Sequence, residues 1–458
     1  MSKNALRFRR EFRALKTALL ALAFGLFLLI VPGFAQTEKI NSWLGEDGEY
    51  SDAANWEMGA VPGPSEVAAF APQGAIKVTL DGDATVGRLE VNGMADGDVN
   101  PQVDFDLNGH TFTVGSAETL TRNSLPAFYL QSLPNTGSRT VMIKNGEVLV
   151  PGGVTLSNAP TDEFSLVIVG QGGALQSSAG SIGNVGRGKV SITDGGKWVT
   201  NGVVYLGRTG LSAEGIVQLT GKDSEWNALG QSGTTRQLVG IGVAGAGTLE
   251  INEGARMHAY VVQLAGHQSH METPDGDGRG TVLIKDQGSS LQCAYLYVGG
   301  GKDRVNDAET PAGGVGSVTV ADQGTMEAGQ LRVFPFSTVT FAGGTISVTG
   351  FFQEKTMTSS VFEPGSVLGY RLGKAGLPAP FTATDLTINQ VKLDIALGEG
   401  FLASPGQVFP LISYSGDLTG TFAGLANGAT LKAGSSTLVI DYGTPAEKTI
   451  TLKVVSGQ

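Results

Sequence analysis

Apolar and polar positions repeat five times in one short pattern between residues 188 and 333. Each copy opens on a glycine, alternates two aliphatic residues with variable ones, passes through a turn rich in Gly and Asp, and closes on one large apolar residue. The opening glycines stand 27, 32, 33 and 36 residues apart, at Gly188, Gly215, Gly247, Gly280 and Gly316. Self-similarity at such a period indicates an array of stacked structural units.

The alternation inside each copy predicts β-strands. Val190 and Ile192 alternate with polar residues, as do the equivalent residues of the other copies, and this is the period of a strand with one buried face. One such coil cannot bury its own apolar side, so it must stack on the next coil. We therefore predict an all-β fold in which residues 65–350 form a right-handed parallel β-helix. The unequal spacing predicts loops inserted at one corner, the longest at 267–279 and 300–315.

The segment before the β-helix, residues 36–64, differs from the repeats in composition. It holds Trp43, Tyr50 and Trp56 among turn-forming residues. A solenoid needs its apolar ends covered, so this composition predicts an aromatic cap. The alternative is that Trp43 and Trp56 form a platform on which sugars stack.

After residue 350 the repeated pattern stops. We expect residues 351–378 to form a closing segment that seals the last coil. Short alternating stretches, such as Leu386-Thr387-Ile388, then predict a compact antiparallel β-module at 379–458.

Two motifs carry a resemblance to a known group of proteins. The first places six residues at fixed spacing before a proline turn, namely Trp43, Gly45, Gly48, Tyr50, Asn55 and Trp56. The second is Gly420-Thr421-Phe422-Ala423-Gly424-Leu425. In these motifs the chain resembles exported bacterial β-helix proteins of the autotransporter-associated repeat, passenger-like type. The resemblance implies a surface protein and no particular chemistry. We recognise neither a translocator barrel nor a Pro-Glu-Pro sorting tail, and expect neither.

Composition and net charge indicate which kinds of molecule this protein can bind. Glycine makes up 68 of 458 residues, about twice its usual ~7% share, and it falls at strand ends, where tight corners are needed. The net charge of -11, with no basic stretch beyond the first sixteen residues, argues against nucleic acid. The expected partners are extracellular polysaccharides or components of the cell envelope.

Residues 1–35 have the three-part layout of a secretory signal. Basic residues up to Lys16 precede the apolar run 17–31, and the small residues Gly33 and Ala35 predict cleavage after Ala35. An Arg-Arg pair at 9–10 fits twin-arginine export, but the strongly apolar run favours the general secretory route. About fifteen apolar residues are short of the ~20 needed to span a bilayer, so we expect no stable membrane span after cleavage. The predicted location is extracellular or the cell surface.

Acidic residues recur in the turns of the repeats, at Asp194, Asp286 and Asp322, with Glu253 near the same place in another copy. One interpretation is a turn preference, because Asp hydrogen-bonds its own backbone. The other is a row of carboxylates that contacts an ion or a glycan.

A partial calcium loop is the best candidate for a metal site. Asp275, Asp277 and Asp286 have calcium-loop spacing, but Arg279 stands where a third oxygen ligand belongs. We therefore expect no cofactor and no metal, with calcium as the weaker alternative. His267 and His270 lie in the same long loop, and we expect them to be solvated rather than to bind a metal ion.

Large apolar residues end each repeat, and two of them are tryptophans. Trp198 and Trp226 are candidate glycan contacts, together with Tyr260. They share their register with Met257 and with other apolar residues, so a place in the core is the competing interpretation. The single cysteine, Cys293, lies in a strand-like stretch and is predicted to be a buried structural thiol.

The function that these features favour is a non-catalytic secreted scaffold, structural or adhesive, that contacts glycans through its corner loops. The alternative is a polysaccharide lyase or glycoside hydrolase, since parallel β-helices include both classes. Either enzyme needs carboxylates from neighbouring coils to converge on one cleft. No acid in this sequence stands in a recognisable constellation with a second acid and a base, so no catalytic residue is predicted.

Overall fold

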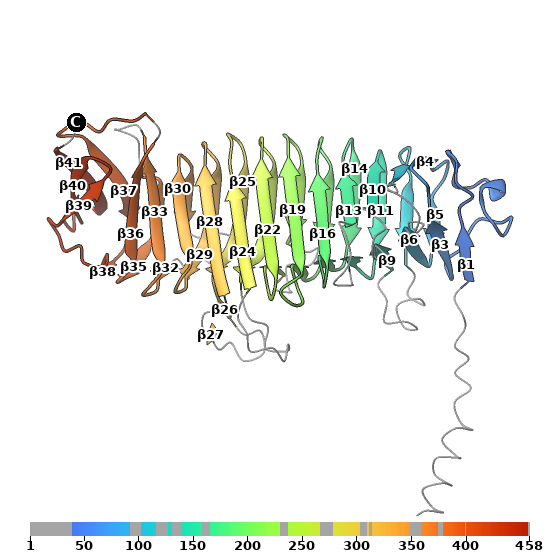
Figure 1. The fold of residues 1–458 in the computed structure, drawn as a ribbon, viewed down its shortest axis with the longest axis horizontal. Coiled ribbons are helices and arrows are strands. Elements are labelled where there is room, and N and C mark those ends of the chain that lie inside the picture. The colour runs from blue at the N-terminus through green and yellow to red at the C-terminus, as the bar shows by residue number, and fades with distance from the viewer. Residues whose placement is uncertain are drawn as a thin grey trace, which may run out of the picture. The chain divides into compact units, whose positions relative to one another are not determined.

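In the computed structural model the chain winds in coils, and most strands lie parallel to the strand one coil away (Figure 1). The residues that the structure describes are 39–91, 102–115, 127–130, 139–157, 165–229, 237–265, 278–302, 309–310, 314–348, 359–373, 379–398 and 400–456. The coils belong to one unit, Ile40–Gln458. The prediction of an all-β solenoid is confirmed.

One face of the solenoid, here called the first face, is a 13-stranded parallel sheet. Its strands are β2 (Gly48–Glu49), β4 (Ala75–Thr79), β7 (Gln102–Asp106), β10 (Arg139–Lys144), β13 (Ser165–Val169), β16 (Arg187–Ile192), β19 (Glu214–Thr220), β22 (Ala246–Asn252), β24 (Gly278–Ile284), β28 (Gly314–Ala321), β30 (Thr338–Ala342), β33 (Val367–Leu372) and β36 (Lys392–Leu397).

Two further faces belong to one 26-stranded sheet. The second face contains β5 (Ala84–Val86), β8 (Thr111–Val114), β11 (Gly146–Val150), β14 (Gly173–Ser177), β17 (Lys197–Thr200), β20 (Glu225–Ala228), β31 (Thr345–Val348), β34 (Phe381–Ala383) and β37 (Val408–Tyr414). The third face contains β3 (Glu66–Phe70), β6 (Arg88–Val91), β9 (Phe128–Leu130), β12 (Val154–Leu156), β15 (Gly180–Ile182), β18 (Val204–Leu206), β21 (Leu238–Ile241), β32 (Ser359–Phe362), β35 (Asp385–Asn389) and β38 (Leu418–Thr421). The faces merge because three nine-residue strands run through both, namely β23 (Arg256–Leu264), β25 (Ser290–Val298) and β29 (Thr325–Val333).

The five predicted repeats stack in the predicted register. Gly188, Gly215, Gly247, Gly280 and Gly316 pair one with the next along the first face. A Cβ at any of these positions would overlap the backbone where the preceding or same coil leaves the third face. The glycine is therefore required by close backbone approach, which explains why it opens every copy.

Aliphatic residues of successive coils line the interior of the solenoid. On the first face Val190, Val217, Leu249, Val282 and Val318 form one continuous row, and all are fully buried. These residues belong to a single core that runs through the stacked coils. The alternation seen in the sequence is thus the alternation between core and outer surface.

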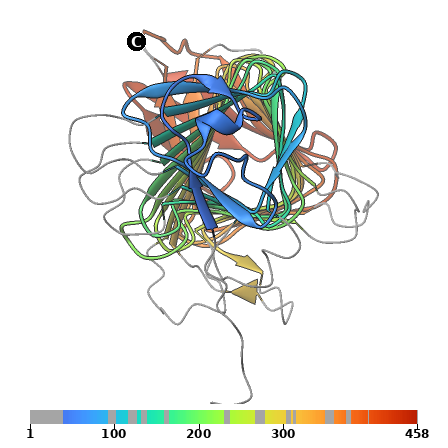
Figure 2. The ribbon, with the colours of Figure 1, turned by 90° about the vertical axis from the view of Figure 1, so that its right-hand side faces the viewer.

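Aromatic residues cover the N-terminal end of this core, seen end-on in Figure 2. Trp43 and Trp56 meet edge to face, with ring centroids 5.1 Å apart, and each also contacts Phe70. Only 6% of Trp43 and 1% of Trp56 is exposed. Rings buried this deeply offer no platform for a sugar, so the cap interpretation accounts for them and the platform does not. The strand β1 (Lys39–Ser42) and the short 3-10 helix η1 (Ala53–Asn55) complete this end.

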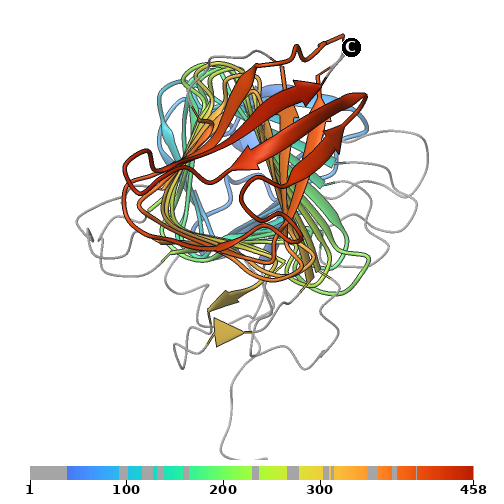
Figure 3. The same ribbon diagram turned by 90° about the vertical axis from the view of Figure 1, so that its left-hand side faces the viewer.

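The C-terminal boundary predicted at residue 379 is wrong. Strands β34, β35 and β36 still pair in parallel with the preceding coil, and so does β38. Antiparallel pairing joins β37 to β41 (Thr449–Ser456), β41 to β40 (Ser436–Asp441) and β40 to β39 (Thr430–Ala433), and these strands cross the end of the solenoid in Figure 3. Alternation of apolar residues marks a strand with one buried face, and the parallel strands of this solenoid have one buried face as antiparallel strands do, which is why the sequence did not separate the two cases.

Loops leave the solenoid at more than one corner, which corrects the prediction of a single corner. The two longest predicted loops do share a corner, between the third face and the first: one follows β23, and the other follows β25 and holds the small hairpin of β26 (Gly301–Lys302) and β27 (Glu309–Thr310). Other insertions separate β20 from β21 and β31 from β32, where the second face passes to the third.

Candidate functional site

The two tryptophans predicted as glycan contacts lie in the core. Trp198 and Trp226 are fully buried and stacked, with ring centroids 4.7 Å apart and planes 12° from parallel. Each indole N–H donates to a hydroxyl of the preceding coil: Trp198 to Ser177 at 3.1 Å and Trp226 to Thr200 at 3.2 Å. Solvent does not reach either ring, so the predicted role in glycan contact is wrong. The shared register with Met257 correctly predicted a place in the core.

Small residues beside the two indoles make room for them. Along the second face the neighbouring interior row runs through Ser177, Thr200, Ala228, Ala259 and Cys293. Ser177 and Thr200 lie where the two indole N–H groups need an acceptor. The coils that follow have no tryptophan at this position, and there the row continues with Ala259 and Cys293. The two indole N–H groups are therefore paired, as buried polar groups require.

The recurring acidic residues occupy one turn geometry at the corner between the first and second faces. Asp194, Glu253, Asp286 and Asp322 have φ values of 50°, 55°, 74° and 46°. Asp and Asn adopt this left-handed region more readily than most residues, so the turn itself selects for them. Sequence reasoning missed Asp223, whose φ of 71° places it in the equivalent turn of the second copy.

These five acids stand on five consecutive coils, whose strands lie about 4.8 Å apart, but Asp223 lies two residues further along its turn than the other four. Asp286 has a structural role there, since its carboxylate accepts a hydrogen bond from the backbone N–H of Glu253 at 3.3 Å. Within the described part of the chain, no three His, Cys, Asp or Glu residues gather closely enough to hold a metal ion. Asp275 and Asp277, and the His267 and His270 pair, lie outside the described residues.

Tyr260 belongs to a cluster of three tyrosines on the outside of β23 and β25. Its ring meets Tyr295 edge-on at 5.6 Å, and Tyr295 stacks with Tyr297 at 6.2 Å. Tyr297 is only 8% exposed, and so is Gln263 on the adjacent coil. Tyr260 and Tyr295 are both partly exposed, so the role of Tyr260 in glycan contact stays a prediction.

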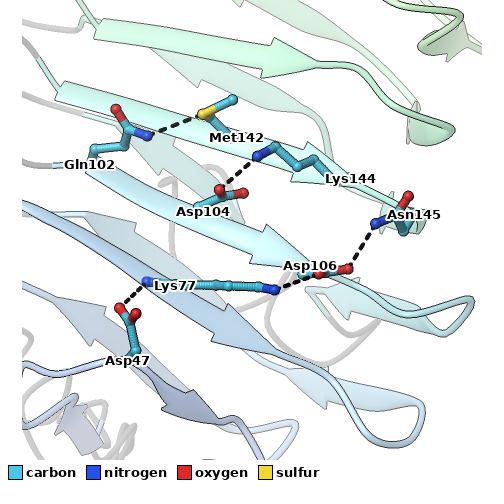
Figure 4. A network of polar contacts seen from close by, with 8 residues as sticks. All are labelled: Asp47, Lys77, Gln102, Asp104, Asp106, Met142, Lys144 and Asn145. Carbon is cyan, nitrogen blue, oxygen red and sulfur yellow. Dashed lines mark hydrogen bonds and ion pairs between the residues drawn. The ribbon is translucent and has the colours of Figure 1, made fainter.

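A charged network on the outer side of the first face was not predicted (Figure 4). The Lys77 ammonium lies 2.8 Å from the Asp106 carboxylate, which also accepts from the Asn145 amide at 3.0 Å. Beside it, Lys144 and Asp104 pair at 2.7 Å. The Lys77 and Asn145 hydrogen bonds hold the pKa of Asp106 below its usual value. These pairs join residues 29 to 40 positions apart, so only the stacking register brings them together.

Cys293 is a structural thiol, as predicted. It is fully buried, and burial raises the pKa of its thiol to about 12. A thiol that stays protonated and unreached by solvent is unreactive.

Comparison with protein-family models and with curated proteins found no match. Among the residues that the structure describes, no helix is long and apolar enough to span a membrane.

Proposed function

We propose that this chain is a non-catalytic scaffold that works outside the cytoplasm and presents corner loops to polysaccharides or envelope components. The observation that carries the proposal is the register of the repeats. Each position that recurs from copy to copy has a structural role: the opening glycine, the aliphatic core pair, the left-handed turn and the closing apolar residue. The repeated positions therefore maintain the stacking of the coils.

Loop length is what varies between coils. The corner links between the third and first faces differ in length: the link between β21 and β22 holds four residues, 242–245, and the link between β23 and β24 holds thirteen, 265–277. A solenoid tolerates such insertions because each coil contacts only its neighbours. Surface loops on a rigid frame are where binding function concentrates. The signal-like residues 1–35 support export of the frame.

A panel of polysaccharides incubated with the purified mature chain tests the proposal. We expect no release of reducing ends or unsaturated products, and any binding to be lost when residues 266–277 are replaced by a short Gly-Ser link. Product release that disappears in Asp286→Asn or Asp322→Asn would overturn the scaffold proposal in favour of a β-helix lyase or hydrolase. Glu225→Ala, which changes an outward side chain on the second face, is the matched control.

A further inference from the structure

One row of outward side chains on the second face becomes polar where the strands are longest. On β17 this outer row holds Val199, which is followed on the next four coils by Asn227, His258, Gln292 and Glu327. None of these four side chains is buried. Because neighbouring strands lie about 4.8 Å apart, the row runs along the solenoid axis with one polar side chain on each coil.

Two amides in this outer row are each held at one end. The Asn227 carbonyl oxygen accepts from the backbone N–H of Leu229 at 3.1 Å, and the Gln292 amide donates to the Glu327 carboxylate at 2.9 Å. Within the described part of the chain, nothing engages the Asn227 amide N–H groups, the Gln292 carbonyl oxygen or the His258 imidazole. The row therefore presents both donors and acceptors to a ligand.

A similar pair on the first face is used at both ends. There the Gln218 amide donates to the Glu250 carboxylate at 3.1 Å, and its carbonyl oxygen accepts from the Lys189 ammonium at 2.7 Å. Gln218 thus ties three coils together and has a structural role. Gln292 makes only one of these two bonds, so its carbonyl oxygen stays available, and Gln218 provides a matched control.

Tyrosine rings lie beside the outer row. Tyr260 follows His258 by two residues on the same strand, and Tyr295 lies on the next coil. Their rings meet edge-on with centroids 5.6 Å apart, and both are partly exposed. Tyr295 also stacks with Tyr297 at 6.2 Å, which holds its ring in place. Sugars suit this combination, because their C–H faces pack on aromatic rings while their hydroxyls need donors and acceptors.

We propose that these residues form a strip that binds an extended, neutral, β-linked polysaccharide lying along the solenoid axis. The strip consists of Asn227, His258, Tyr260, Gln292, Tyr295 and Glu327. The rise of about 4.8 Å from coil to coil is close to the rise per sugar of such a chain, so successive sugars meet successive coils. The proposal rests on the scaffold function above, to which it adds a class of glycan and a contact surface beside the corner loops.

Charge around the strip favours a neutral glycan over an acidic one. Glu327 belongs to the strip, and in the neighbouring outward row Glu225 lies opposite Arg256. Two carboxylates thus stand against one guanidinium, on a chain whose net charge is -11. A polyuronate would meet like charge both locally and over the whole molecule, whereas a neutral chain would not.

Affinity electrophoresis of the mature chain tests the strip, in gels that contain hydroxyethylcellulose or galactomannan as neutral probes and alginate as the acidic one. We expect the neutral probes to slow the wild-type chain and alginate not to. Tyr260→Ala/Tyr295→Ala should weaken binding at least tenfold and Gln292→Ala about fivefold, whereas Tyr260→Phe/Tyr295→Phe keeps the rings and should stay within about twofold. Gln218→Ala should bind like wild type.

Four results would overturn the proposal. They are no retardation of the wild-type chain by either neutral probe, equal or stronger retardation by alginate, wild-type binding in the folded Gln292→Ala variant, and equal losses in Gln292→Ala and Gln218→Ala. Circular dichroism checks folding, and Gln292→Ala carries the test if the double alanine variant does not fold. Failure of the scaffold function looks different: it shows as product release, or as binding that survives replacement of residues 266–277.

Discussion

Replacing Trp226 by alanine tests whether the large apolar residue of each repeat holds the stack together. The side chain is fully buried, stacks on Trp198 and donates to Thr200 at 3.2 Å. A buried aromatic side chain of about 200 Å², at about 25 cal/mol per Å², contributes roughly 5 kcal/mol, an upper figure because unfolded chains already bury some surface. Measured aromatic-to-alanine substitutions in cores cost about 3–5 kcal/mol. We expect a loss of about 4 kcal/mol.

Trp226→Phe separates the packing from the hydrogen bond. It keeps a ring against Trp198 but removes the N–H and some volume, so we expect a smaller loss of about 1–2 kcal/mol. Glu225→Ala on the same strand removes an outward side chain and should stay within about 0.5 kcal/mol of wild type.

Urea unfolding followed by circular dichroism measures these differences through the midpoint and slope of the transition. A loss below about 1 kcal/mol in Trp226→Ala, with an unchanged slope, would refute the packing argument. So would quenching of the Trp198 and Trp226 fluorescence by acrylamide in the folded state, because both rings would then be open to solvent.

Further predictions follow from the core, the thiol, the charged network and the N-terminus. Ile251→Asp places a carboxylate in the fully buried interior and should cost several kcal/mol, whereas the same change at the outward Thr248 should cost little in thermal unfolding. Cys293 should not react with a thiol reagent in the folded chain and should react fully in guanidinium; fast reaction before unfolding would contradict its burial. Since the folded pKa of Asp106 is lowered, its stabilising effect is present above about pH 4 and lost as the pH falls through the folded pKa. Asp106→Asn should therefore lower the urea midpoint at pH 7 and match wild type near pH 2, and a difference independent of pH would refute the pairing. Intact mass of the exported protein should start near Gln36, and export with Met1 retained would contradict cleavage.

The sequence predicted those parts of the fold that depend on one coil and its copies. The glycine at Gly247 and the apolar pair at Leu249 and Ile251 repeat because every coil meets the same neighbours, so their pattern is visible without a structure. The register of Trp226 with Met257 likewise favoured the core over glycan contact.

Features that depend on pairing between coils were not predictable from one sequence. The charged pair of Lys77 and Asp106 needs the stacking register, and neither residue belongs to a repeated motif. The direction of pairing around Leu386 was misjudged because alternation is the same in parallel and antiparallel strands.

Disulfide trapping across two coils tests the stacking register most directly, since the scaffold proposal depends on it. Thr281 and Ser317 are register partners on the first face and point outward. Neighbouring strands lie about 4.8 Å apart, within the Cα separation that a disulfide accepts. Thr281 and Thr319 are offset by two residues, which lengthens the separation to about 8 Å and forbids the bond.

Both cysteine pairs are made in a Cys293→Ala background, because Ala259 and Ala328 already flank that position in the core row. Under mild oxidation of the folded protein, the account predicts that Thr281→Cys/Ser317→Cys closes almost completely and that Thr281→Cys/Thr319→Cys stays reduced. Equal closure of the two pairs, or preferential closure of the offset pair, would contradict the stacked register.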